Sequence, residues 1–149
     1  MQVESVDIAS IFPDPANART HGEKNLRAIK GSLARFGQQK PIVIGKNNVV
    51  IAGNGTLEAA RDSGWTKINV VRTTLEGTDA TAFALADNRT SELAAWDDAV
   101  LDKTLRALTD LNFDVGEIGF DVPAELNPGL TDPDDVPETP KDVWVKAGD

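Results

Sequence analysis

Apolar residues recur with a helical period between positions 20 and 37, where the first well-defined element of the chain is predicted. The residues at this spacing are Leu26, Ile29, Leu33 and Phe36. Thr20 and Glu23 have the spacing of a capping box at the start of the segment, and Gly37 follows it as a C-terminal glycine. The pattern predicts an amphipathic helix that Thr20 caps and Gly37 ends.

Two short apolar runs after this helix predict a β-hairpin. They span 41–44 and 49–52 and are joined by a short polar turn. After a loop at 53–56 the helical period returns and continues up to Gly64, and 68–71 predicts another strand. This succession of short strands and helices indicates a small α/β domain.

The loop at 53–56, with the sequence Gly-Asn-Gly-Thr, is the strongest candidate for a functional site. Its two glycines allow a tight turn and the close approach of another group, because neither carries a Cβ. Asn54 or Thr56 can cap a helix that begins at Thr56 and ends near Ser63, and the free N–H groups of its first turn point into the loop. A strand, a glycine loop and a helix N-terminus are typical of phosphate binding. A turn that uses glycine for geometry alone is the alternative.

Two further helices are predicted in the middle of the chain. The first spans about 78–85, is capped by its first residue and places Phe83 in the core. The second spans 97–111, and Trp96 before it is expected to fill the core or to act as a hydrophobic staple. A short turn at 117–120 is expected to pack back on this helix.

Three segments of the chain carry motifs in a fixed order. They are Asn17-Ala-Arg19 followed by Gly37-Gln-Gln-Lys-Pro41-Ile-Val-Ile, then Gly53-Asn54-Gly55-Thr56, then Ala84-Leu-Ala-Asp87-Asn88-Arg89-Thr-Ser-Glu92-Leu. In order and spacing they resemble the N-terminal domain of the ParB family, which shares its fold with sulfiredoxin, over residues 3–95. The resemblance implies a ParB/sulfiredoxin-like α/β (α+β) domain at 1–95, with a small mixed sheet and packed helices. A helical extension at 96–120 is expected to follow and to pack on this domain.

The same resemblance implies a site for a nucleoside triphosphate, CTP or ATP, with Mg²⁺. The nucleotide-binding residues that it implies are Arg19, Gly53, Asn54, Gly55, Thr56 and Asn88. Arg19 would supply a fork of donors to the phosphates, and Asp87 with Asn88 would hold the magnesium ion. These two residues are predicted to lie at a helix end, so a C-cap with Asn88 in a left-handed conformation is a second interpretation, compatible with the first.

The chain departs from the ParB pattern at two places. ParB has Glu and two Arg where this chain has Asn54, Gly55 and Thr56, so the basic side chains that embrace a triphosphate there are absent. Ser91 stands where ParB has Arg, and Arg89 lies two positions earlier. The loop is closer to the phage and mobile-element branch of the family, whose members are commonly joined to a DNA methyltransferase. Sulfiredoxin itself is excluded, because its reaction needs a nucleophilic cysteine and the chain has none.

The C-terminal segment 121–149 has the composition of an extended, charged linker. It holds eight acidic residues, two lysines and five of the eight prolines, and such a segment buries too little apolar surface to offset the entropy of ordering. Residues 143–149 resemble the lead-in to the methyltransferase in fused relatives. We therefore expect a methyltransferase domain in cis, in a longer protein of which this chain is a fragment.

Charge is distributed unevenly over the chain. The net charge of −9 argues against a protein whose main role is to coat DNA, yet positions 19–46 hold seven basic residues and one acid. This part is expected to face a nucleotide or DNA, unless its basic residues only form the solvated face of a helix. No apolar run is long enough to span a membrane, no signal peptide is recognisable, and cysteine is absent, so a cytoplasmic location is expected.

The sequence predicts a nucleotide-binding, DNA-associated module that can form a homodimer, and it leaves two other classes of function open. One is an enzyme of the same superfamily, a nucleoside triphosphatase or a nuclease, although no complete catalytic set is visible. The acidic residues available for metal-dependent nuclease chemistry are Asp14, Glu58, Asp87 and Glu92. The other class is a partner- or DNA-docking module without nucleotide binding. His21 is the one histidine, so no zinc site is predicted, and a contact between His21 and a ligand is less expected than an incidental position.

Overall fold

The computed structural model describes residues 1–121, which divide after Ala94 into two compact units. The predicted acidic linker lies outside the described residues from residue 122 on. Within residues 1–121, no helix is long and apolar enough to cross a membrane.

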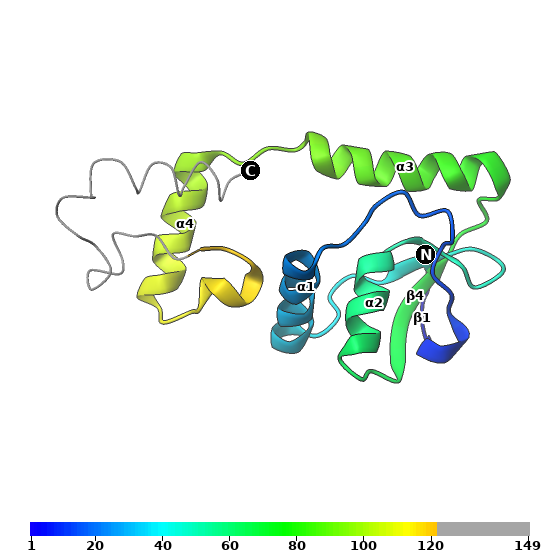
Figure 1. Ribbon diagram of the computed structural model, residues 1–149, viewed down its shortest axis with the longest axis horizontal. Coiled ribbons are helices and arrows are strands. Elements are labelled where there is room, and N and C mark those ends of the chain that lie inside the picture. Colours follow the sequence, from blue (N-terminus) through cyan, green and yellow to red (C-terminus); the bar gives the residue numbers. More distant parts are fainter. Residues whose placement is uncertain (122–149) are drawn as a thin grey trace. The chain divides into compact units, whose positions relative to one another are not determined.

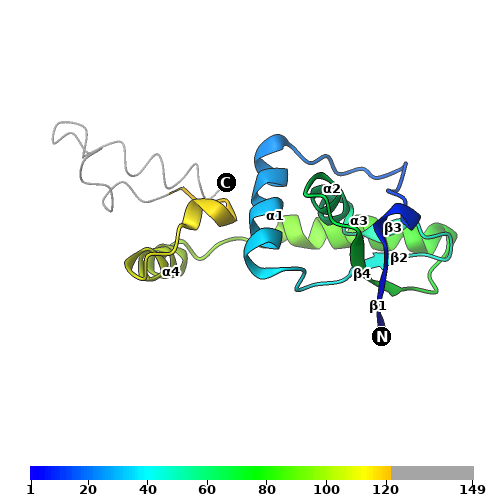
Figure 2. The ribbon, with the colours of Figure 1, turned by 90° about the horizontal axis from the view of Figure 1, so that it is seen from below.

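The first unit is built on one mixed sheet with the strand order β1-β4-β2-β3. Figure 2 labels its four strands. The strands are β1 (Val3–Asp7), β2 (Ile42–Ile44), β3 (Val50–Ala52) and β4 (Lys67–Arg72). β4 pairs antiparallel with β1 and parallel with β2, while β2 and β3 form an antiparallel hairpin. The predicted hairpin, the later strand and the predicted fold class are therefore confirmed.

Two helices, α1 (Glu23–Phe36) and α2 (Asn54–Asp62), pack against each other and bury the core of this unit (Figure 1). α1 contributes Leu33 to the core, and α2 contributes its buried face. The buried residues of the core cluster are Ile8, Ile11, Leu33, Ile42, Ile44, Val50, Leu57, Ala59, Ala60, Ile68 and Val70. Removing this apolar surface from water is the main driving force that fixes α2, and with it the glycine loop, against β2 and β3.

The predicted side-chain caps of these two helices are wrong. α1 begins at Glu23 with Gly22 as N-cap, so Thr20 lies outside the helix and closes no capping box. α2 begins at Asn54 with Gly53 as N-cap, and neither Asn54 nor Thr56 caps it. Glycine occupies both N-cap positions and has no side-chain oxygen to offer. The predicted end of α1 is confirmed, because Gly37 adopts φ +72° and its N–H donates to Leu33 O (2.9 Å).

The third helix, α3 (Gly77–Leu93), is longer than predicted and contacts β3. Neither glycine nor proline occurs between positions 78 and 93, so nothing in the local sequence ends the helix near position 85. Asn88 therefore lies inside the helix, and its predicted position as a left-handed C-cap is wrong. The N-cap is Glu76 rather than Thr78, and Phe83 is half-buried.

Gln38 links the end of α1 to the sheet through its side-chain amide. Its Nε2 donates to Asn69 O (2.9 Å), and its Oε1 accepts from Asn69 N–H (2.8 Å). The side chain thus pairs with the backbone of β4 as a strand would, four residues before β2 begins. These two bonds position the segment that connects α1 to the hairpin.

The second unit contains helix α4 (Asp98–Asp110) and the 3-10 helix η2 (Val115–Ile118). Asp97 caps α4 by accepting from Val100 N–H (3.1 Å), close to the predicted start of this helix. Trp96 packs edge-on against Phe120, with ring centroids 5.6 Å apart. η2 contacts α4, which confirms the prediction that the turn near 117–120 packs back on this helix. Trp96 is 56% exposed, so the prediction that it fills the core is wrong.

Candidate functional site

The glycine loop connects β3 to α2 and leaves the first backbone N–H groups of the helix without helical partners. Gly53 adopts φ +108°, and a Cβ built on it would lie 2.5 Å from Ile42 Cγ2, so both its backbone and its surroundings require glycine. The first helical bond is donated by Leu57 N–H to Gly53 O (3.0 Å). The N–H groups of the three residues before Leu57 precede this bond and are available to a ligand.

Asn54 does not cap α2 but joins the loop to the N-terminal segment. Its Oδ1 accepts a hydrogen bond from Asp14 N–H (3.1 Å). Arg61, further along the same helix, donates to Ile11 O. These contacts hold the segment around Asp14 against α2, and the segment then continues towards Arg19.

Arg19 reaches α3 from this N-terminal segment. Its Nη1 donates to Asn88 Oδ1 (3.3 Å), which joins two residues that are 69 positions apart. The Asn17 side chain brackets the Arg19 backbone, since its Oδ1 accepts from Arg19 N–H (3.2 Å) and its Nδ2 donates to Arg19 O (3.0 Å). The guanidinium group is exposed, but the backbone of Arg19 is held in place. The remaining N–H donors of the guanidinium group can therefore form hydrogen bonds to a bound ligand.

His21 lies directly against the first turn of α2. A Cβ built on Gly55 would fall 2.5 Å from His21 Cε1 and 2.9 Å from each ring nitrogen. The ring can approach the helix backbone this closely because position 55 is glycine. No sequence pattern predicts this contact, since Gly55 and His21 are far apart in the chain and His21 is the one histidine.

A cavity of about 160 Å³ lies at the N-terminus of α2, between the segment 17–21, α1 and α3. Residues that line it include all six that the sequence predicted to bind nucleotide, namely Arg19, Gly53, Asn54, Gly55, Thr56 and Asn88, together with Asn17 and His21. Typical ligand pockets have volumes of about 300–1,000 Å³. The cavity is therefore of a size to hold part of a ligand, such as a group of phosphates.

The ionisable side chains that line this cavity are Arg19 and His21, and no carboxylate of the described residues lines it. The positive end of the α2 dipole and the free N–H groups of its first turn point the same way. A guanidinium and a helix N-terminus both favour an anion. The site is thus suited to phosphate or carboxylate groups and unsuited to a cation held by carboxylates.

Comparison with protein families places the chain in one of them. The ParB N-terminal domain family matches residues 1–89, which is more than half of the sequence. The chain belongs to this family. No curated protein matches the sequence.

Solved structures of ParB N-terminal domains share the fold of the chain. The C-terminally truncated chromosome-partitioning protein ParB from Caulobacter crescentus, complexed with CTP-γ-S, superposes with a TM-score of 0.64 at 16% identity, over 72% of this chain and 63% of that one. The Pnob8-like ParB-N domain gives a TM-score of 0.51 at 16% identity, over 74% of this chain and 47% of that one. The chain thus spans less than two thirds of these proteins.

In this ParB N-terminal domain, Asp87 does not share the cavity with Asn88. Adjacent positions of an α-helix point about 100° apart, and Asp87 is exposed and absent from the lining of the cavity. Its backbone carbonyl accepts from the hydroxyls of Thr90 and Ser91 (3.1 Å each). Within residues 1–121, no group of three or more His, Cys, Asp or Glu residues could hold a metal ion. Magnesium at Asp87 and Asn88 stays a prediction.

The displaced arginine of the third motif, Arg89, lies beside the site. It pairs with Glu92 at 3.2 Å, and both residues line a neighbouring cavity of about 500 Å³ that also includes Arg19 and Asn88. Ser91, at the position of the ParB arginine, does not line either cavity. Arg89 is therefore close to the Arg19–Asn88 contact despite its shifted position in the sequence.

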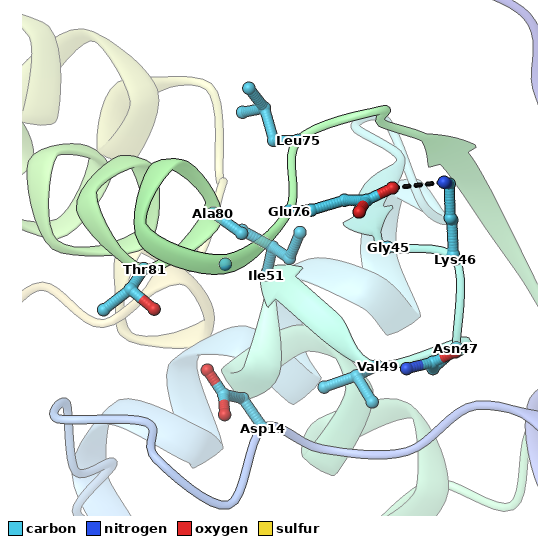
Figure 3. A pocket seen from close by; sticks show the side chains of 11 residues that line it. Asp14, Gly45, Lys46, Asn47, Val49, Ile51, Leu75, Glu76, Ala80 and Thr81 are labelled. Carbon is cyan, nitrogen blue, oxygen red and sulfur yellow. Dashed lines mark ion pairs between the residues drawn. The ribbon is translucent and has the colours of Figure 1, made fainter.

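A further cavity of about 530 Å³ lies between the hairpin turn, the start of α3 and Asp14 (Figure 3). Asp14 and Thr81 approach it from different elements, and Lys46 pairs with Glu76 at its rim. Ile51 lines this cavity and also the cavity at α2. The sequence did not predict it, because its lining comes from three separate segments, none of which carries a motif.

Proposed function

We propose that residues 1–94 bind a nucleoside triphosphate and act as a nucleotide-responsive, DNA-associated module. The observation that supports this most strongly is the cavity at the N-terminus of α2, where Arg19, Asn88 and the glycine loop meet. In this proposal the phosphates accept from the N–H groups of residues 54–56 and from the hydroxyl of Thr56. Arg19 donates to a phosphate from the opposite wall, and Asn88 holds its guanidinium in place.

CTP is the first nucleotide to test. The C. crescentus ParB structure is complexed with CTP-γ-S, and the fold of this chain matches it. ATP remains the second candidate, since Gly53–Thr56 lacks the basic pair of the ParB box and the base contacts need not be shared. Mg²⁺ would accompany the triphosphate. Asn88 would offer it an amide oxygen from the cavity wall, and the carboxylate of Asp87, which is exposed and points away from the cavity, would have to reach it from outside.

DNA is the proposed macromolecular partner. A second C. crescentus ParB structure, complexed to the centromeric parS site, superposes with a TM-score of 0.50 at 16% identity, over 77% of this chain and 62% of that one. Exposed basic residues on or near α1, including Lys24 and Arg27, supply the positive surface that DNA requires. We place the module at the N-terminus of a phage-type DNA methyltransferase, where nucleotide binding would close one copy on another and help the enzyme grip its DNA.

Calorimetric titration with CTP, ATP and GTP, with and without Mg²⁺, tests the proposed function. We expect micromolar binding of one nucleotide to the full chain and at least tenfold weaker binding to Gly55→Ala, because the new Cβ fills the cavity and displaces His21. The backbone at Gly55 is helical, so the variant should keep its thermal stability.

Two outcomes would contradict this function. If no nucleotide binds, the glycine loop is a structural turn and the domain docks DNA or a protein partner instead. If one binds but Gly55→Ala binds it equally well, the nucleotide lies elsewhere, and the 530 Å³ cavity becomes the next candidate.

A further inference from the structure

The hydrogen bonding of His21 defines which of its ring nitrogens can meet a ligand. Nδ1 lies 2.6 Å from Asn25 Oδ1. An amide oxygen can only accept, so Nδ1 carries a hydrogen and donates it. Among residues 1–121, no partner bonds to Nε2. With Nδ1–H committed to Asn25, Nε2 of the neutral ring carries only a lone pair, and it becomes a donor only when the ring is an imidazolium.

The position of the ring places Nε2 at an anion site. His21 lines the same cavity as Arg19 and contacts the first turn of α2 at Gly55. Phosphate oxygens accept hydrogen bonds and repel the lone pair of a neutral imidazole nitrogen. A phosphate in this cavity therefore favours the doubly protonated ring, and the second proton must come from solvent.

The other charged groups on α1, α2 and α3 do not replace His21 as the group that takes up a proton. Arg19 is the second ionisable residue of the cavity wall, and its guanidinium group can only donate hydrogen bonds. On α1, Glu23 pairs with Arg27 at 3.2 Å; on α2, Glu58 is exposed; neither lines the cavity. The part of α3 that lines it contributes the neutral Asn88.

We propose that His21 couples anion binding to proton uptake. The imidazolium donates from Nδ1 to Asn25 and from Nε2 to a phosphate oxygen, and the bound state holds up to one proton more than the free protein and ligand. This inference rests on the proposed nucleotide site. It adds a binding residue and a pH dependence that neither the glycine loop nor Arg19 would produce, since both stay donors throughout the neutral range.

Calorimetry with CTP at pH 6, 7 and 8, in buffers of different ionisation enthalpy, tests this coupling on the full chain. For the wild type, linkage predicts that the affinity for CTP rises about tenfold from pH 8 to pH 6, beyond any change seen with His21→Gln. It also predicts the uptake of up to one proton on binding. The comparison variant is His21→Gln, whose amide nitrogen offers a donor near the position of Nε2 at every pH. It should bind CTP but lose the extra pH dependence, and the titration of CTP itself is common to both proteins.

His21→Ala should also lose the extra pH dependence, and at pH 6 it should bind CTP about tenfold more weakly than the wild type does. Identical pH profiles for the wild type and His21→Gln, or undiminished proton uptake in either variant, would overturn the role of His21 while leaving the nucleotide site intact. If CTP does not bind the wild type, inorganic tripolyphosphate is titrated in its place. Tripolyphosphate binding with the predicted pH profile would support His21 while rejecting the nucleotide, and no binding of either ligand would reject both.

Discussion

Gly53→Ala is expected to destabilise the first unit by about 2–5 kcal/mol. Two separate costs add in this variant. Alanine must adopt φ +108°, and its Cβ must sit 2.5 Å from Cγ2 and 2.8 Å from Cβ of Ile42, a core residue with 2% exposure. Ile42 Cβ is fixed to the backbone of β2, so the strand or the loop has to shift. Urea unfolding followed by circular dichroism measures the effect.

Gly64→Ala is the matched control for this prediction. Gly64 also has a left-handed backbone, with φ +81°, but no atom lies within 4 Å of the Cβ that alanine would add. Only the conformational cost applies there, about 1–2 kcal/mol. Equal destabilisation by the two substitutions would show that the contact with Ile42 relaxes without cost and that the loop is less closely fitted to β2 than the structure indicates.

Arg19→Ala is expected to weaken nucleotide binding about 10- to 100-fold, because one hydrogen bond to a charged group contributes about 1.5–3 kcal/mol. Arg19 is the permanent positive charge of the cavity wall, and its contact with Asn88 at 3.3 Å directs it across the site. The stability of the fold should stay unchanged, because the side chain is exposed. Titration of CTP measures the loss.

Two further substitutions make the interpretation specific. Arg19→Lys keeps the charge but not the planar fork, so it should recover only part of the affinity. Arg27→Ala removes an exposed arginine of α1 that pairs with Glu23, outside the cavity, and should bind CTP as the wild type does. If Arg19→Ala and Arg27→Ala weaken binding equally, the effect is a general one of net charge and Arg19 has no direct role.

Local sequence patterns predicted the fold where a single physical rule decides the outcome. Gly37 ends α1 because its left-handed backbone favours glycine, and the hairpin follows from two apolar runs around a polar turn. The start of α1 and the length of α3 were wrong. Thr20 and Glu23 have the spacing of a capping box, but α1 begins after Gly22. α3 continues past position 85 because its residues favour a helix and neither glycine nor proline interrupts it.

The candidate site was predicted largely through the family resemblance, which named six residues that the structure gathers around one cavity. Physical reasoning on the sequence identified only the glycine loop. The contact between His21 and Gly55 could not be predicted, because it depends on how the segment 17–22 returns over α2, and no local pattern specifies that path. Asp87 shows the opposite case, in which a neighbour of a site residue in sequence points elsewhere on the helix.

The most direct test of phosphate binding at the N-terminus of α2 is a ¹H–¹⁵N nuclear magnetic resonance titration of the full chain with CTP and Mg²⁺. The amides of Asn54, Gly55 and Thr56 precede the first helical hydrogen bond, so they should show the largest shifts, together with the Arg19 side chain. The amides of Gly45 and Thr81, at the separate cavity of Figure 3, should move little. Saturable shifts confined to that second cavity, or no shifts at all, would contradict a nucleotide site at the N-terminus of α2.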